Sequence, residues 1–322
     1  MKRTRIHKVA SHLALALLLS PLAAHAADES SYEEAISADA GAAKAINRNY
    51  NFAGDGSVEI SNVCGTVTVI GSNENRIVLS GSLGAGSRLI IEGDARHLEL
   101  NVEAQHPGGV LGKHGPPSDT NLELSVPHAV ALKLDLVSAD GKVTGVDGKS
   151  LEIESVSGNV RGSAAPRSVE IDNVSGAISF DASRAGAIER AHVQTVSGDI
   201  AVGGVEGRVK LETVSGKIGY AAPSVSEFNA ESVSGTIDAN AAPAKGAHLH
   251  AETMSGTVKM RLPAALSARL SASTFSGGIR SDFGSVKKAE YGPGSSLDAR
   301  VGDGDARIET QSFSGDIQIL KQ

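Results

Sequence analysis

Tryptophan is absent from this 322-residue sequence, and aromatic residues together make up only 3% of it. This composition fits a thin aliphatic core, and it leaves no indole ring to stack on a sugar. The single cysteine, Cys64, excludes a disulfide within the chain. We interpret Cys64 as structural, with a bridge to another molecule as the alternative. No stretch beyond residue 26 approaches the about 18 consecutive apolar residues of a transmembrane helix, so we predict no transmembrane segment.

The first 26 residues have the three parts of a signal peptide. A basic start (Lys2, Arg3, Arg5, Lys8) precedes an apolar run from Leu13 to Ala24, and Ala24-His25-Ala26 fits a cleavage site. We therefore predict an exported protein that begins at Ala27 and is located in the periplasm, at the cell surface or outside the cell. Removal of this segment, which has four positive and no negative residues, takes the formal net charge from −7 to −11. Such an acidic chain is not expected to bind nucleic acid or an anionic membrane surface.

A six-residue motif recurs about every 20 residues through the second half of the chain. One clear copy is Thr213-Val214-Ser215-Gly216-Lys217-Ile218. The glycines of the other copies are Gly158, Gly176, Gly198, Gly235, Gly256, Gly277 and Gly315. Successive glycines lie 18 to 22 residues apart, and a last step of 38 residues indicates two coils with one degenerate copy. Such a period on β-type residues is typical of stacked coils. We predict an all-β fold, a single-stranded parallel β-solenoid (β-helix) with coils of about 18–22 residues.

Within one coil, apolar and polar residues alternate, which predicts a strand with one buried face. Val209 and Leu211 are expected in the core, and Ser215-Gly216 is expected to form a bend, because glycine adopts positive φ without a clash. We interpret Val214 as breaking the alternation at this bend. The same position holds Met254 and Phe275 in coils where an inward residue shrinks to alanine, which we interpret as volume compensation in a close-packed interior.

The β pattern divides the chain into a few parts. Residues 1–26 are the predicted signal peptide, 27–45 a flexible leader, and 46–322 the β-solenoid repeat domain. Within this domain, residues 105–119 form a Gly/Pro-rich loop insertion, and residues 291–305 an irregular stretch before the last coil.

The repeated Val-Ser-Gly-Asp-Ile type motif, a weaker copy at residues 62–69 and the closing segment 308–317 resemble a bacterial family of proposed adhesin domains of unknown function. This family is common in exported envelope proteins. The resemblance covers roughly residues 46–322. It implies a β-solenoid and a cell-envelope setting, and it supplies no catalytic residues.

One outward position of the coil is repeatedly acidic and is the best candidate for a functional surface. This column contains Glu154, Asp172, Glu212, Glu231 and Glu252, with Gln194 in the remaining place. One interpretation is a stripe that weakly binds cations such as Ca²⁺, or a basic partner; another is a solvated strand face without a specific role. A glycosidase would need two carboxylates about 5 Å or about 6.5–9.5 Å apart, and a ladder offers both separations.

Other polar columns have plainer interpretations. His192, His248 and His250 face outward, and His106 and His114 lie in the loop, but none completes a known metal-ligand spacing. We therefore predict no metal, cofactor or catalytic residue. An inward column of hydroxyl and amide side chains predicts a hydrogen-bonded ladder. Its members are Ser155, Asn173, Thr195, Thr213, Ser232, Thr253 and Thr274.

These observations predict a non-enzymatic exported β-solenoid that provides a binding, adhesin-like or structural surface in the cell envelope. Its partner would be an unknown envelope protein or a glycan. The alternative is a polysaccharide-acting β-helix enzyme that uses the outward carboxylates. Such an enzyme builds a cleft from long loops, whereas the long loop Gln105–Asp119 contains no carboxylate except Asp119.

Overall fold

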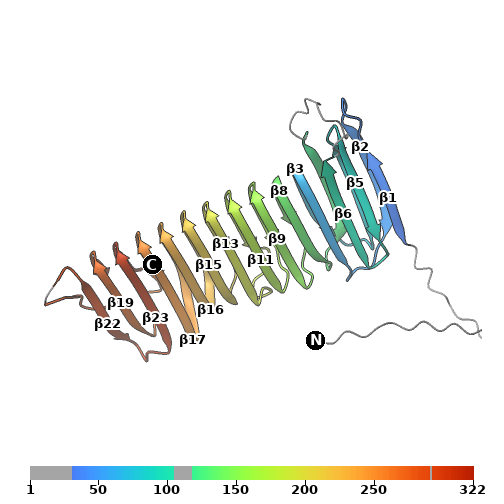
Figure 1. The fold of residues 1–322 in the computed structure, drawn as a ribbon. Helices are drawn as coiled ribbons and strands as arrows, with labels where there is room; N and C mark the ends of the chain where they lie inside the picture. The colour runs from blue at the N-terminus through green and yellow to red at the C-terminus, as the bar shows by residue number, and fades with distance from the viewer. Residues whose placement is uncertain (1–30, 105–117, 291) are drawn as a thin grey trace, which may run out of the picture.

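The structure is a computed structural model, and it describes residues 31–104, 118–290 and 292–322. These residues form 24 strands and no helix, arranged as a long stack (Figure 1). The expected all-β class is therefore confirmed. The predicted signal peptide and most of the predicted 105–119 loop insertion lie outside the described residues.

The strands of the N-terminal part are β1 Tyr32–Ser37, β2 Lys44–Asn51, β3 Ser57–Ser72, β4 Arg76–Leu83, β5 Ser87–Gly93, β6 His97–Ala104 and β7 Thr120–Pro127. The middle contains β8 Ala131–Thr144, β9 Ser150–Ser157, β10 Val160–Ala164, β11 Ser168–Ser175, β12 Ile178–Ala182, β13 Arg190–Ser197, β14 Ile200–Gly203, β15 Arg208–Ser215, β16 Ile218–Ser234, β17 Ile237–Ser255 and β18 Val258–Leu262. The C-terminal part contains β19 Ala268–Ser276, β20 Ile279–Ser281, β21 Lys287–Lys288, β22 Ser295–Val301, β23 Ala306–Ser314 and β24 Ile317–Lys321.

The middle of the stack has the expected parallel register. The first strand of each repeat pairs with that of the next, as in β9–β11–β13–β15, and the short second strands β10, β12 and β14 pair in the same way. We call the row of first strands, which continues through residues 227–234 of β16 and 248–255 of β17, the first face. The row of second strands is the second face. Parallel neighbours are about 4.8 Å apart, so equivalent residues of successive coils form columns.

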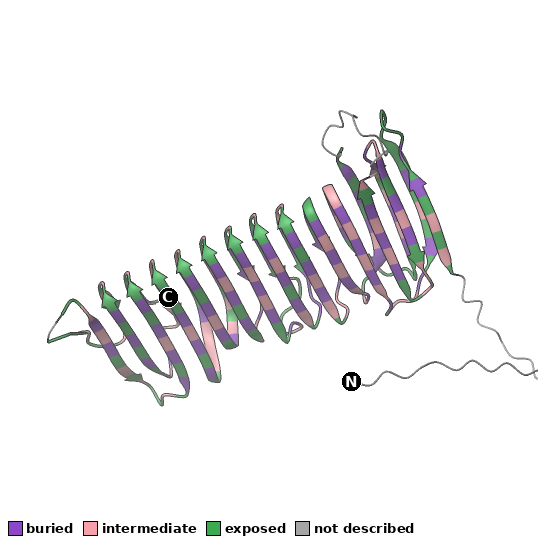
Figure 2. Ribbon diagram, in the orientation of Figure 1, coloured by how far each residue is buried: buried purple, intermediate pink, exposed green. Residues whose placement is uncertain are grey.

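The core lies between the two faces and is mainly aliphatic, as predicted, with Phe180 and Phe228 as its largest fully buried side chains. The first inward column, Leu151, Val169, Ala191, Val209, Phe228, Leu249 and Leu270, is at most 2% exposed throughout. Alternating buried and exposed residues follow each strand (Figure 2). The inward hydroxyl column is also buried, but the expected hydrogen-bonded ladder is wrong for most of it. Asn173 donates to the Gly158 and Gly176 carbonyls, whereas the hydroxyls of Ser155, Thr195, Thr213, Ser232 and Thr253 have no partner among the described residues.

Side chains after the bend glycine connect neighbouring coils. The Asp199 carboxylate, one residue after Gly198, accepts a hydrogen bond of 2.8 Å from the backbone N–H of Lys217 in the next coil. Asn159 accepts from the N–H of Ala177 in the same way, at 3.2 Å. This role accounts for the Asp or Asn that follows Ser-Gly in three of the eight copies of the motif, since it satisfies a backbone donor at the corner.

Both ends of the stack depart from the predicted serial order. β17 pairs with β23, and β23 pairs with β19, so the C-terminal coil is inserted between two coils that precede it in the sequence. Similarly, β8 pairs with β3, which pairs with β6 and β7. The step of 38 residues therefore contains an excursion to the end of the stack and back, rather than a degenerate coil.

Antiparallel strands complete each end. Within the predicted irregular stretch 291–305, β22 pairs antiparallel with β19. At the other end, β1 pairs antiparallel with β5 and β2 with β4. Residues 27–45 are thus not wholly a flexible leader, because the alternation around Ile36 buries this side chain to 4% exposure. The parallel arrangement predicted for the whole domain holds for the middle coils and gives way to antiparallel pairing at the ends.

Candidate binding groove

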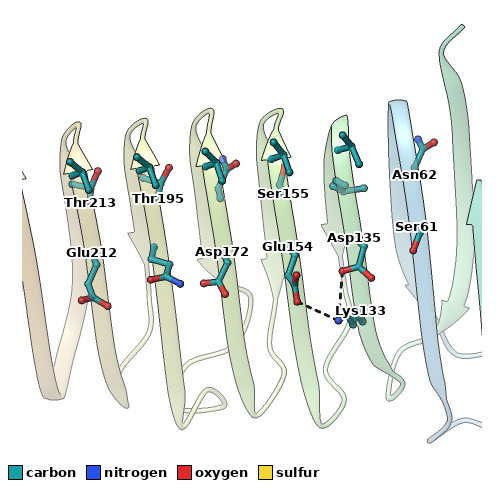
Figure 3. A pocket seen from close by; sticks show the side chains of 18 of the residues that line it. Ser61, Asn62, Lys133, Asp135, Glu154, Ser155, Asp172, Thr195, Glu212 and Thr213 are labelled. Atoms are coloured by element: carbon teal, nitrogen blue, oxygen red, sulfur yellow. Dashed lines mark hydrogen bonds and ion pairs between the residues drawn. The ribbon is translucent and has the colours of Figure 1, made fainter. Parts of the chain in front are cut away.

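A groove of about 1170 Å³ crosses the first face, from residues of β6 and β3 to β17. It runs along the stack and therefore across the strands. Each coil from β9 to β17 contributes an outward polar residue and, two positions later, an outward apolar residue, such as Glu212 and Val214 of β15. Figure 3 shows the polar residues of neighbouring coils side by side.

The apolar side of the groove belongs to a continuous exposed row, which we call the ridge and which Phe313 and Phe275 extend beyond the groove. In spatial order its members are Val137, Val156, Val174, Val196, Val214, Val233, Met254, Phe313 and Phe275. Each side chain is 46–60% exposed, and the Phe275 and Phe313 rings stack with centroids 5.0 Å apart. Our interpretation of Val214, Met254 and Phe275 as interior residues is therefore wrong. The strand continues through Ser215, so the period of two places Val214 outward.

The acidic side of the groove is the predicted column, and the register brings its members together. Asp172 lies beside Glu154, Glu231 beside Glu212, and Glu252 beside Glu231, while Gln194 separates Asp172 from Glu212. We call this column, together with Asp135 of β8, the acid row. Asp135 pairs with Glu154 and was missed by the sequence analysis. The alternation of apolar and polar residues over residues 132–136 places Asp135 outward, as it does Glu154 on the next strand, and could have identified it.

Basic side chains compensate the acid row only in part. Lys133 lies 3.2 Å from Glu152, 3.3 Å from Glu154 and 3.7 Å from Asp135. Lys210 lies 2.7 Å from Glu212. Over the acid row and the next outward row from β8 to β17, eight carboxylates face two lysines. These two rows therefore have an excess of six negative charges when their histidines are neutral, and the residues that line the groove itself have six carboxylates and one lysine.

Two histidines on this face contact acids. His192 Nε2 lies 2.9 Å from Glu212, and His250 Nε2 lies 3.4 Å from Glu252. Among the described residues, no group of three or more His, Cys, Asp or Glu side chains is arranged to hold a metal ion. The predicted loop histidines, His106 and His114, lie outside the described residues.

Two carboxyls of the acid row have shifted pKa values in opposite directions. Burial raises the pKa of Glu212, but hydrogen bonds from Lys210 and His192 outweigh this effect and hold it below its usual value. Burial dominates at Asp135, whose pKa is raised, with Lys133 opposing the shift. The hydrogen bond to Glu152 is the main cause of the raised pKa of Lys133.

The lowered pKa of Glu212 predicts a pH-dependent contribution to stability. Its pKa in the unfolded chain is about 4.3 and lies higher than in the folded chain, so the ionised carboxylate stabilises the fold above about pH 4.3. This contribution is lost as the pH falls through the folded-state value. Chemical denaturation at about pH 6 and about pH 3 should therefore show that the stability advantage of the parent over Glu212→Gln shrinks in acid. Glu123→Gln, at an exposed position on the second face, is the control. A parent advantage that is equal at both pH values would contradict the prediction.

Cys64 lies outside this row of acids and at the start of its own bend. Its Sγ donates to Asp119 Oδ1 at 3.0 Å. This hydrogen bond, with burial, raises the pKa of the thiol, which makes it a poor nucleophile near neutral pH.

In the described part of the chain, no helix has the length and apolar character needed to cross a membrane.

Three solved structures cover most of this chain at low sequence identity. A proposed lipid-binding protein from Parabacteroides distasonis ATCC 8503 has a TM-score of 0.47 and 14% identity, over 86% of this chain and 96% of that chain. A proposed adhesin from Bacteroides fragilis NCTC 9343 has a TM-score of 0.39 and 12% identity, over 86% and 97%. A proposed cell adhesion protein from Clostridium sporogenes ATCC 15579 has a TM-score of 0.28 and 12% identity, over 87% and 99%.

No curated protein matches the chain at a significant level. Two overlapping segments, residues 117–208 and 186–320, match the family model described as Toastrack DUF4097. These segments include the repeated motifs of the second half and the closing segment 308–317, but not the weaker copy at residues 62–69. The resemblance is confirmed, and the chain belongs to the Toastrack DUF4097 family.

Proposed function

We propose that this chain is an exported, non-enzymatic β-solenoid of the cell envelope whose first face binds an elongated partner. The observation that carries the proposal is the ridge, nine exposed apolar side chains in one row, seven of which lie beside the acid row. Apolar side chains scattered singly over a surface need no explanation, but a contiguous apolar patch with a polar rim is typical of an interaction site.

Strand formation alone does not require apolar side chains at the ridge positions. A strand tolerates Thr at an exposed position at little cost, because Thr is β-branched like Val and suits a pleated surface. Seven successive coils nevertheless have Val or Met at this position, from Val137 to Met254. The outward position two residues earlier on the same strands is polar in every case. Export rests on the signal peptide predicted for residues 1–26.

Retention on cell-envelope material tests this function. The exported chain, residues 27–322, should sediment with envelope fractions of the source bacterium. Replacing Val196, Val214 and Val233 by Thr keeps their shape while removing apolar surface, and should reduce this retention by about tenfold. Ile70→Thr, at an apolar residue of the second face that is 40% exposed, is the matched control. Retention of the triple variant at the parent level, with unchanged thermal stability, would refute the proposed binding face.

A further inference from the structure

The groove places two different chemical surfaces in parallel lines. On each strand except β13, where Gln194 takes the place of the acid, an acidic residue and a ridge residue are two positions apart, as in Glu231 and Val233. This separation corresponds to about 6.6 Å. Each line repeats at the strand spacing of about 4.8 Å. From β8 to β17 there are six such steps, so the doubly lined part of the groove is about 29 Å long. A partner in this part contacts both lines along its whole length.

The negative charge of the groove favours a partner with positive charge. The excess of carboxylates over lysines on the groove wall favours a cation and disfavours acidic peptides, nucleic acids and anionic glycans. A neutral glycan would leave the acids without a complementary charge, and within the doubly lined part it would find valine and methionine rather than aromatic rings to stack on. The complementary partner therefore has both basic and apolar side chains.

Hydrogen bonding excludes a partner that binds by extending the sheet here. Each strand beneath the groove already has a neighbour on both sides; β13, for example, pairs with β11 and β15. No strand edge is available along the groove, so a β-strand partner would lie there with its own backbone groups unpaired. A helix and a polyproline II segment avoid this problem, since the first is bonded internally and the second is solvated.

The repeat distance separates these two conformations. An α-helix advances about 5.4 Å per turn, against the strand step of about 4.8 Å, and so drifts by half a step after about four turns. A polyproline II segment has three residues per turn and advances about 9.3 Å, which nearly equals two strand steps of about 9.6 Å. One residue of each triplet can face the ridge and another the acid row, turn after turn, while the third faces solvent.

We infer that the groove binds a basic segment of a protein partner in the polyproline II conformation, with apolar and cationic residues at a period of three. The inference rests on the proposed function and specifies its partner. About nine residues of such a segment span the doubly lined part of the groove. Towards the C-terminal end, Gln311 and Ser273 take the places of the acids, and Phe313 and Phe275 those of the valines. The segment thus has a direction, with its bulky apolar end over β23 and β19.

Synthetic peptides test this inference by fluorescence anisotropy on the mature chain. The probe contains about four Val-Lys-Pro triplets, because proline favours the polyproline II conformation. A peptide of the same composition with its period broken, and an amphipathic Lys/Leu helix of the same charge, are the comparisons. We expect the triplet peptide to bind at least about tenfold more tightly than either, and to weaken as salt is raised.

Surface variants locate the binding site. Glu231→Gln with Glu252→Gln should weaken the triplet peptide about fivefold, because two cation contacts are lost. Glu123→Gln with Glu290→Gln removes the same charge at exposed positions that do not line the groove, and should leave binding unchanged. Both pairs lie on the surface, and thermal melts verify their folding.

The outcomes separate this inference from the proposed function. Equal binding of the broken-period peptide, tighter binding of the helix, or equal effects of the two variant pairs would each overturn the polyproline II partner. Loss of envelope retention in the ridge variant would still support the binding face in that case. If the ridge variant keeps its retention while the triplet peptide binds at the acid row, the proposed envelope function fails and the peptide site remains.

Discussion

Replacing Gly216 by valine should destabilise the protein by about 3 kcal/mol or more. Gly216 has φ +146°, where side chains are strained by about 1–3 kcal/mol. An added Cβ would also lie 1.9 Å from the carbonyl oxygen of Gly198 in the preceding coil. Relieving this clash requires the two coils to separate, at a further cost of about 1–3 kcal/mol for overpacking. Separation would also weaken the hydrogen bond between these two coils from the Gly198 N–H to the Ser215 carbonyl, now 3.0 Å long.

Gly219→Ala in β16 provides the matched control, three residues further along the same coil. A Cβ at Gly219 would lie 3.7 Å from its nearest neighbour, the Ile200 carbonyl oxygen, which is an ordinary contact. This substitution should be neutral, or stabilising by up to about 1 kcal/mol through the unfolded state. Urea denaturation of both variants and the parent provides the comparison. A Gly216→Val protein that unfolds at the parent's midpoint would show that the coils do not approach each other as closely as described.

The bend glycines show which features the six-residue motif predicts and which it does not. Positive φ was predicted for this position, and it is found at Gly216 and Gly256. Gly235 lies in the same column without a left-handed φ, yet its Cβ would lie 1.9 Å from the Gly216 carbonyl. Contact between coils therefore requires glycine even where the local backbone conformation does not. That contact is a property of the stack and is invisible within one six-residue motif.

Of the two sides of the groove, the acidic side could be predicted from the sequence and the ridge was missed. Except for Asp135, the acid row followed from the repeat, because the register of equivalent residues is set by the period. The ridge was missed because valine, methionine and phenylalanine were assigned to the core by their hydrophobicity. Strict alternation from Leu211 through Thr213 would have placed Val214 outward. When strand alternation places a residue outward although the residue is apolar, this disagreement indicates a binding surface.

The spatial order of the coils could not be predicted from their sequences. Leu249, Ile308 and Leu270 occupy one inward column, and each would pack against either of the other two. The repeated pattern specifies what a coil is, but not which coil lies next to it. The order is set at the ends, where β22 covers β19 and leaves a place for the C-terminal coil. Detecting this requires contacts between segments far apart in the chain.

A disulfide between Ser255 and Ser314, each changed to Cys in a Cys64→Ser background, should form readily and tests this order. The two residues are register partners on β17 and β23, so their Cα atoms are about 4.8 Å apart, within the range of a disulfide. The bond closes a loop of roughly 60 residues and should raise the free energy of unfolding by up to about 4 kcal/mol.

The control pair is Ser255→Cys with Ser276→Cys in the same background. Ser314 lies between these two residues, because Ser276 is its register partner on the other side. Their Cα atoms are therefore about 9.6 Å apart, too far for a disulfide without backbone movement. Thiol counting by mass spectrometry after mild oxidation should find the first pair closed and the second pair open. The opposite result would mean that the coils stack in their sequence order and that the C-terminal coil does not lie between β17 and β19.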